Sequence, residues 1–232
     1  MSRFKLLKSR SRGKAPALLA LAAVAALGVA APAQAAFIGY VCNDVSCTGG
    51  DDVVVVDEGA GDNANGTLGI LSFTASNIGG ITIAVNTSQS KPLLGTGMDL
   101  AFVATDASGG GGDVWLYAAA TDFTGSAPSR GAIGGTSDNG TVVAAMCGGG
   151  SNVQFNTSNC QFSSILTGTF AEEFGALTTT ADPYSLLLGV RITLTANGTT
   201  TGDFRVDVPE PTTLGLFGLG LLGVARARRR RQ

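Results

Sequence analysis

Short apolar stretches that alternate with polar residues constrain this 232-residue chain more than any other feature. In the segments 81–85 and 190–195 every second residue is apolar, as in strands with one buried and one solvated face. No stretch of a dozen residues carries a convincing 3.6-residue apolar repeat, so no amphipathic helix is predicted for the body. The pattern predicts strands at 52–56, 67–76, 80–87, 98–105, 114–120, 141–146, 153–156, 165–170, 184–196 and 203–208.

The breaks between these segments are rich in glycine, asparagine and aspartate. Asp138-Asn139-Gly140 and Asn197-Gly198 are residues that accept the positive φ angles of tight turns. About ten strands at this spacing suit a β-sandwich or a jelly roll. The absence of a repeat of constant period argues against a solenoid or propeller. We therefore expect an all-β, sandwich-like or jelly-roll-like body.

The N-terminus has the pattern of a Sec-type signal peptide over residues 1–35. Six basic residues precede an apolar run at 15–31, and Ala33 and Ala35 are the small residues that signal peptidase accepts. Ala36 is then the new N-terminus. A transmembrane helix is the alternative, because about 17 apolar residues approach the length of a membrane span. The alanine-rich run and its Ala-x-Ala end favour cleavage.

The remaining body, residues 36–207, is predicted to be one extracytoplasmic domain that is strongly acidic. It contains four basic and 16 acidic residues, and therefore has a net charge of −12. Such a body is repelled by phosphate backbones, so nucleic acid is excluded as a partner. The chain has no histidine, which excludes Ser-His-Asp and Cys-His catalysis within it.

All four cysteines lie in the body, which fits an oxidising, extracytoplasmic location. Three pairings are possible. We favour Cys42 with Cys47 and Cys147 with Cys160, because each pair is close in sequence and the second brackets a Gly/Asn-rich segment. The competing interpretation is metal ligation, but no histidine is available and the spacings are not those of a zinc ribbon.

One loop contains enough oxygen ligands to suggest calcium. Asp57, Asp62, Asn63 and Asn65 lie among glycines, although the EF-hand spacing and its closing glutamate are absent. A plain acidic loop is the favoured interpretation. We expect no other cofactor.

Two further features bear on carbohydrate chemistry. Trp115 and Tyr117 fall on the same face of one predicted strand, where they could stack on a sugar, although burial in the sandwich is favoured. The carboxylate clusters 51–52, 57–58 and 172–173 leave a carboxylate-based hydrolase possible in principle. They lie beside turn residues, so solvated loops are favoured.

The C-terminal tail, residues 208–232, combines three features in a fixed order. Val208, Pro209, Glu210 and Pro211 precede a 14-residue apolar run at 212–225, and then a basic segment at 226–232 with Arg226, Arg228, Arg229, Arg230 and Arg231. As a helix the run is about 21 Å long, which is short for a hydrocarbon core of about 30 Å. The arginines remain cytoplasmic under the positive-inside rule, so the body is exported. A plain membrane anchor is the alternative.

This arrangement resembles the PEP-CTERM sorting signal of Gram-negative bacteria, whose tail is sometimes labelled an ice-binding protein C-terminal domain. The resemblance covers roughly the last 25 residues. It implies recognition and processing by exosortase, a membrane cysteine transpeptidase, and an association with extracellular polysaccharide and biofilm matrix.

The resulting prediction is a non-enzymatic cell-surface or matrix protein. The Sec translocon and signal peptidase export it across the inner membrane, and its short helix anchors it transiently before it reaches the cell surface or medium. The alternatives are a carbohydrate-binding surface module and, with less support, a carboxylate-based hydrolase.

Overall fold

The computed structural model describes residues 36–90, 97–125, 129–178 and 180–207. The predicted signal peptide at 1–35 and the predicted membrane helix at 212–225 lie outside these residues. Within them the fold is all-β, as expected from the sequence. The strands are β1 (Phe37–Cys42), β2 (Val53–Val56), β3 (Ile70–Ile78), β4 (Ile81–Gln89), β5 (Gly97–Asp106), β6 (Gly112–Phe123), β7 (Ser129–Gly148), β8 (Gln161–Phe162), β9 (Leu166–Leu177) and β10 (Tyr184–Asp207).

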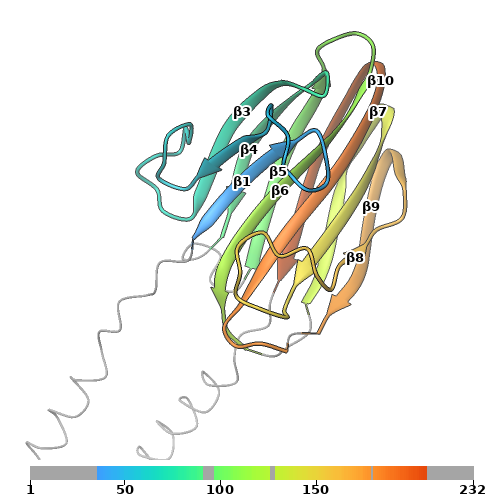
Figure 1. Cartoon of the computed structure of the whole chain (residues 1–232). Coiled ribbons are helices and arrows are strands. Elements are labelled where there is room, and N and C mark those ends of the chain that lie inside the picture. Colours follow the sequence, from blue (N-terminus) through green and yellow to red (C-terminus); the bar gives the residue numbers. More distant parts are fainter. Residues whose placement is uncertain (1–35, 91–96, 126–128, 179, 208–232) are drawn as a thin grey trace, which may run out of the picture. The chain divides into compact units, whose positions relative to one another are not determined.

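The strands lie in two layers, and β7 and β10 belong to both (Figure 1). The first layer has the order β2-β1-β6-β10-β7-β8 and contains residues 184–194 of β10. The second has the order β3-β4-β5-β10-β7-β9 and contains residues 199–207 of β10. Neighbouring strands are antiparallel throughout. The expected sandwich is therefore built from one sheet that folds over on itself.

The crossover between the layers lies where the sequence predicts turns. The register of β7 and β10 shifts so that residues 195–198 lie opposite Asn139 alone. Asn139 and Asn197 have φ angles of 53° and 59°, in the left-handed region that asparagine tolerates. These residues do bend the chain, but they do not end the strand. The predicted strands 184–196 and 203–208 are consequently parts of one 24-residue strand, and 141–146 is part of the 20-residue β7.

The predicted strand at 153–156 is wrong, and the sequence prediction missed β1 and the two-residue β8. Residues 153–156 form a turn-containing loop, held between Cys147 and Cys160 and packed on the sheet by Phe155. β1 was not predicted, because it follows directly on the alanines of the predicted signal peptide and contains a central glycine. Gly39 is required there, since a Cβ atom would lie 2.6 Å from the Phe73 ring of the facing layer.

Asp106, at the end of β5, connects the β5–β6 turn to the bend of β10 by hydrogen bonds. Its carboxylate accepts hydrogen bonds from the backbone N–H groups of Ser108 (3.0 Å), Gly109 (2.9 Å) and Gly111 (3.1 Å), which shape the turn into β6. It also accepts the N–H of Asn197 in the bend of β10, at 2.8 Å. Desolvation alone would raise the pKa of Asp106, but these hydrogen bonds outweigh it and lower the pKa to about 2.

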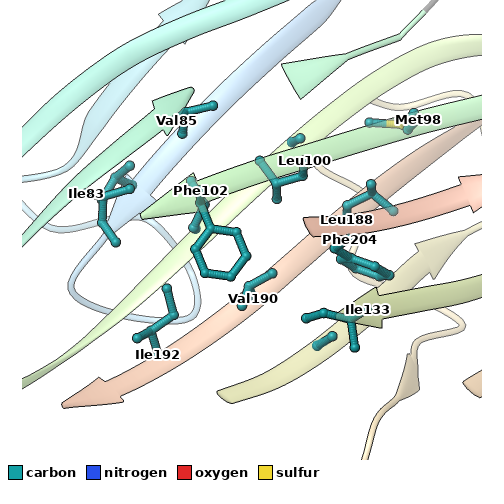
Figure 2. Close-up of a cluster of buried hydrophobic side chains, with 14 of the residues drawn as sticks. Ile83, Val85, Met98, Leu100, Phe102, Ile133, Leu188, Val190, Ile192 and Phe204 are labelled. Carbon is teal, nitrogen blue, oxygen red and sulfur yellow. The ribbon is translucent and has the colours of Figure 1, made fainter. Parts of the chain in front are cut away.

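The core fills the space between the layers. Figure 2 shows Leu188 and Val190, from the first half of β10, beside Phe204 from its second half and Phe102 of β5. All four side chains are 1% exposed or less. Burying a side chain of this size stabilises the fold by about 1.5–3 kcal/mol. The two halves of β10 therefore supply facing sides of the same core.

We predict that Asp106→Ala lowers the melting temperature, because it leaves the N–H groups of the β5–β6 turn and of the β10 bend without their shared acceptor. The matched control is Asp138→Ala, at an exposed position of β7 near the same crossover. Thermal unfolding followed by circular dichroism measures both. Equal melting temperatures for the two variants would contradict the role assigned to Asp106.

Candidate functional site

The outer face of the first layer is covered by two disulfide-bonded loops. Cys42 is bonded to Cys47, and Cys147 is bonded to Cys160, which confirms the favoured pairing. In the chain-entropy model a loop the size of the second contributes about 3 kcal/mol. Both loops close over Tyr117, whose hydroxyl donates a hydrogen bond to the Val45 carbonyl at 3.1 Å.

Trp115 and Tyr117 lie side by side on this outer face, as predicted from their spacing. Their ring centroids are 5.9 Å apart, and Phe155 packs edge-on against Tyr117 at 5.1 Å. Tyr117 is only 3% exposed, and the Arg191 guanidinium lies 5.5 Å from the Trp115 ring centroid. Tyr117 is therefore buried, as favoured, but beneath the disulfide-bonded loops of the outer face and not in the core between the layers. The pair does not form an open stacking platform for a sugar.

The carboxylates of the candidate calcium loop bind backbone N–H groups. Asp62, 7% exposed, accepts from Glu58, Ala64 and Ser72 at 2.9–3.2 Å. Asp57 accepts the N–H of Gly69 at 2.8 Å. These bonds order the loop between β2 and β3. Asn63 and Asn65 have exposed side chains.

Among the residues that the structure describes, no three His, Cys, Asp or Glu side chains are grouped so that they could hold a metal ion. The structure brings Asp57 and Asp62 together in one loop, where both oxygens of Asp62 and one oxygen of Asp57 accept backbone N–H groups.

A groove of about 530 Å³ crosses the outer face of the second layer. Its floor consists of small residues, Ala132 and Gly134 of β7 and Ala171 of β9. These residues and the groove's acidic walls come from adjacent strands, since Asp203 is paired with Gly134 and Gly134 with Ala171. The groove exists because the three side chains at its floor are small.

Charged side chains form the walls of this groove. Asp99 of β5 and Asp203 of β10 lie on one side, and Glu173 of β9 lies on the other. Glu172 also borders the groove, but its carboxylate accepts hydrogen bonds from Ser164. Arg205 also lines it, and its guanidinium donates to Asp207. Sequence reasoning found Glu172 and Glu173 but missed Asp99 and Asp203. Those two belong to strands about a hundred residues apart, and only the register of β5 with β10 brings them together.

Burial raises the pKa of Asp99 to about 7, and a hydrogen bond to Asp203 and that residue's charge add to the shift. Asp99 is therefore protonated below neutral pH, when it can share its proton with Asp203. The arrangement offers oxygen acceptors on both sides of an uncharged floor. It suits a ligand that has several hydroxyl or amino donors.

Most residues of the predicted sorting and cleavage sites, including Ala33, Ala35 and the motif 208–211, lie outside the described part of the chain. Two described residues adjoin them. Ala36 is exposed and its carbonyl accepts the N–H of Thr121 at 3.3 Å. Asp207 ends β10, which is paired through residues 205–207 with β5 on one side and β7 on the other. Both residues lie toward the end of the sandwich opposite the crossover (Figure 1).

In the ranges that the structure describes, no helix has both the length and the apolar character needed to cross a membrane.

Comparison with known families identifies the tail. The family model described as the PEP-CTERM protein-sorting motif matches residues 207–231, which confirms the resemblance drawn from Pro209, Glu210 and Pro211. The chain carries this sorting motif. The motif implies export, passage in a membrane-anchored form before sorting to the cell surface, and processing by an exosortase-type enzyme.

No curated protein matches the chain significantly. Among solved structures, TmCBM61 in complex with β-1,4-galactotriose is similar with a TM-score of 0.38 and 9% identity. The similarity covers 64% of this chain and 92% of that one.

We predict that the protein becomes less stable as the pH rises from about 4 to about 7. Asp99 has a raised pKa in the folded state, so in this window the folded chain binds more protons than the unfolded chain and folding is favoured at the acidic end. Melting temperatures at pH 5 and pH 8 measure the effect. The difference should shrink in Asp99→Asn, and an unchanged difference in that variant would contradict the assignment.

Proposed function

We propose that this chain is a non-enzymatic cell-surface or extracellular-matrix protein of a Gram-negative bacterium, whose tail is removed by an exosortase-like transpeptidase. The observation that carries the proposal is the sorting motif at residues 207–231, joined directly to the last strand of the body. An association with exopolysaccharide or biofilm matrix is part of the proposal, because it accompanies the sorting signal that the tail resembles.

The character of the body supports an extracellular role. Its two disulfides require an oxidising compartment, and its net charge of −12 keeps it soluble. Without histidine the chain has no His-based nucleophile activation. Several clustered carboxylates are hydrogen-bonded to backbone N–H groups, as at Asp57 and Asp62. We therefore assign the body a binding or structural role and no cofactor.

The two ends of the chain support a defined route. The Sec translocon and signal peptidase handle residues 1–35, and the short apolar run at 212–225 with its arginines retains the protein in the inner membrane. A run of about 21 Å is a weak span, which suits temporary retention before processing.

We predict that Glu210→Ala leaves the tail uncleaved, because the glutamate lies between two prolines that hold the chain extended for an enzyme's cleft. Intact-mass measurement of protein from the envelope and the medium gives the C-terminus directly. In a host that contains the sorting enzyme, wild type should lose its tail, whereas the variant should keep it and stay in the membrane fraction.

The control is Asp138→Ala, an exposed acidic residue at the crossover end of the body, which should be processed like wild type. If Glu210→Ala is processed normally, the tail is a plain anchor and the proposed sorting role fails.

The alternative function, carbohydrate binding, is favoured by one observation, the groove over β5, β10, β7 and β9. Its carboxylates and Arg205 can accept and donate hydrogen bonds to sugar hydroxyls across a floor of small residues. A Cβ atom at Gly134 would have only the Phe170 carbonyl oxygen near it, at 3.7 Å, so a larger side chain there fills the groove without a clash.

We predict that, if the body binds glycans, Gly134→Leu weakens binding on a glycan array by about tenfold or more, equivalent to about 1.4 kcal/mol. Trp115→Ala, on the outer face of the other layer, should retain binding. Melting temperatures of both variants confirm that each is folded. Loss of binding in Trp115→Ala alone would move the site to the first layer, and no binding by wild type would remove this alternative.

A panel of polysaccharides tests the third hypothesis, a carboxylate-based hydrolase. Release of sugars from a polysaccharide panel by wild type, abolished in Asp99→Asn or Asp203→Asn, would establish hydrolysis in the groove.

A further inference from the structure

The sorting motif follows the folded body without a spacer. The match to the motif begins at Asp207, which is also the last residue of β10. Residues 205–207 are paired with residues 97–99 of β5 and with 130–132 of β7. The strand is therefore in the middle of its sheet up to the residue that precedes Val208.

This pairing conflicts with the way that peptide-processing enzymes bind their substrates. Such enzymes hold an extended segment through hydrogen bonds to its main chain, as an added strand is held at a sheet edge. The main chain of residues 205–207 already serves two neighbouring strands. These residues cannot lie in an enzyme's cleft and in the centre of the sheet at the same time.

Withdrawing the end of β10 would also disrupt the core. Val206 and Phe204 are both 0% exposed, and Phe204 packs against Phe174 of β9 with ring centroids 5.6 Å apart. A strand at an edge has one partner to lose, whereas this strand has two. Opening the last residues of β10 is therefore much rarer than fraying at an edge strand such as β2.

Resting on the proposed processing of the tail, we propose that the sorting enzyme reads this chain only from Val208 onward, with β10 still paired. The folded sandwich then abuts the enzyme through the end formed by Gly97, Arg130 and Asp207. Val208, Pro209 and Glu210 follow Asp207, and three residues span at most about 10 Å. An enzyme that binds Glu210 must therefore open its cleft within about 10 Å of this end of the sheet. Arg130 and Asp207 have exposed side chains there and are the charged groups that the enzyme meets first.

A disulfide across the end of β10 tests the proposal. Ala132 and Arg205 are direct cross-strand partners, so Ala132→Cys with Arg205→Cys locks β10 to β7 in the oxidising compartment. The matched control is Ala132→Ser with Arg205→Ser. Intact mass after export, with peptide mapping of the new bond, follows processing of the locked chain. We expect the locked and control chains to be processed at rates within about twofold of each other.

A second variant gives an independent result. A Gly-Ser-Gly-Ser spacer between Asp207 and Val208 removes any need to open the strand, so we again expect processing within about twofold of wild type. A locked chain processed about tenfold more slowly than its control, or a spacer that accelerates processing about tenfold, would show that the enzyme takes residues before Val208 and would overturn the proposal.

Glu210→Ala in the same host distinguishes a failure of the proposed function from a failure of the inference about the boundary. If Glu210→Ala blocks processing while the lock or the spacer gives one of these tenfold effects, the proposed function stands and only the inference about the boundary fails. If Glu210→Ala is processed like wild type, the proposed function fails and the inference fails with it.

Discussion

The carboxylate of Asp106 accepts a hydrogen bond from the bend at which β10 passes from one layer of the sandwich to the other. It joins the turn between β5 and β6 to the bend of β10 at Asn197. Because β10 is central in both layers, every other strand is positioned directly or indirectly by this crossing. The core between Leu188 and Phe204 exists only when β10 is folded over.

Because β10 crosses between the layers, its two halves lie under two outer faces of different character. Residues 184–194 of β10 lie under the face covered by disulfide loops and by Tyr117, which leaves little open surface there. Residues 199–207 lie under the face where Gly134 and Ala171 leave a groove, and they place Asp203 and Arg205 at its wall. The same half of the strand leads to the tail. The wall of the groove and the start of the sorting motif therefore both belong to residues 199–207 of β10.

The acidic body uses its carboxylates in two physically different ways. Asp57, Asp62 and Asp106 accept backbone N–H groups and so order the turns around them, although burial and the charges of Asp62 and Glu58 also raise the pKa of Asp57. Asp99 and Asp203 instead face each other at a groove, where burial and mutual repulsion raise the pKa of Asp99. A cluster of acids in the sequence does not distinguish these cases. Hydrogen bonding to the loop backbone accounts for the first group.

The sequence by itself determined the features that are local or linear. Period-two alternation predicted the all-β class, close spacing predicted both cysteine pairs, and the tail 208–232 is recognised as a string of residues that needs no fold. Tertiary structure decided the rest. Positive φ at Asn139 and Asn197 bends a strand or ends it depending on its partners. Asp99 meets Asp203 only because hydrogen-bond register, which involves residues about a hundred positions apart, aligns β5 with β10.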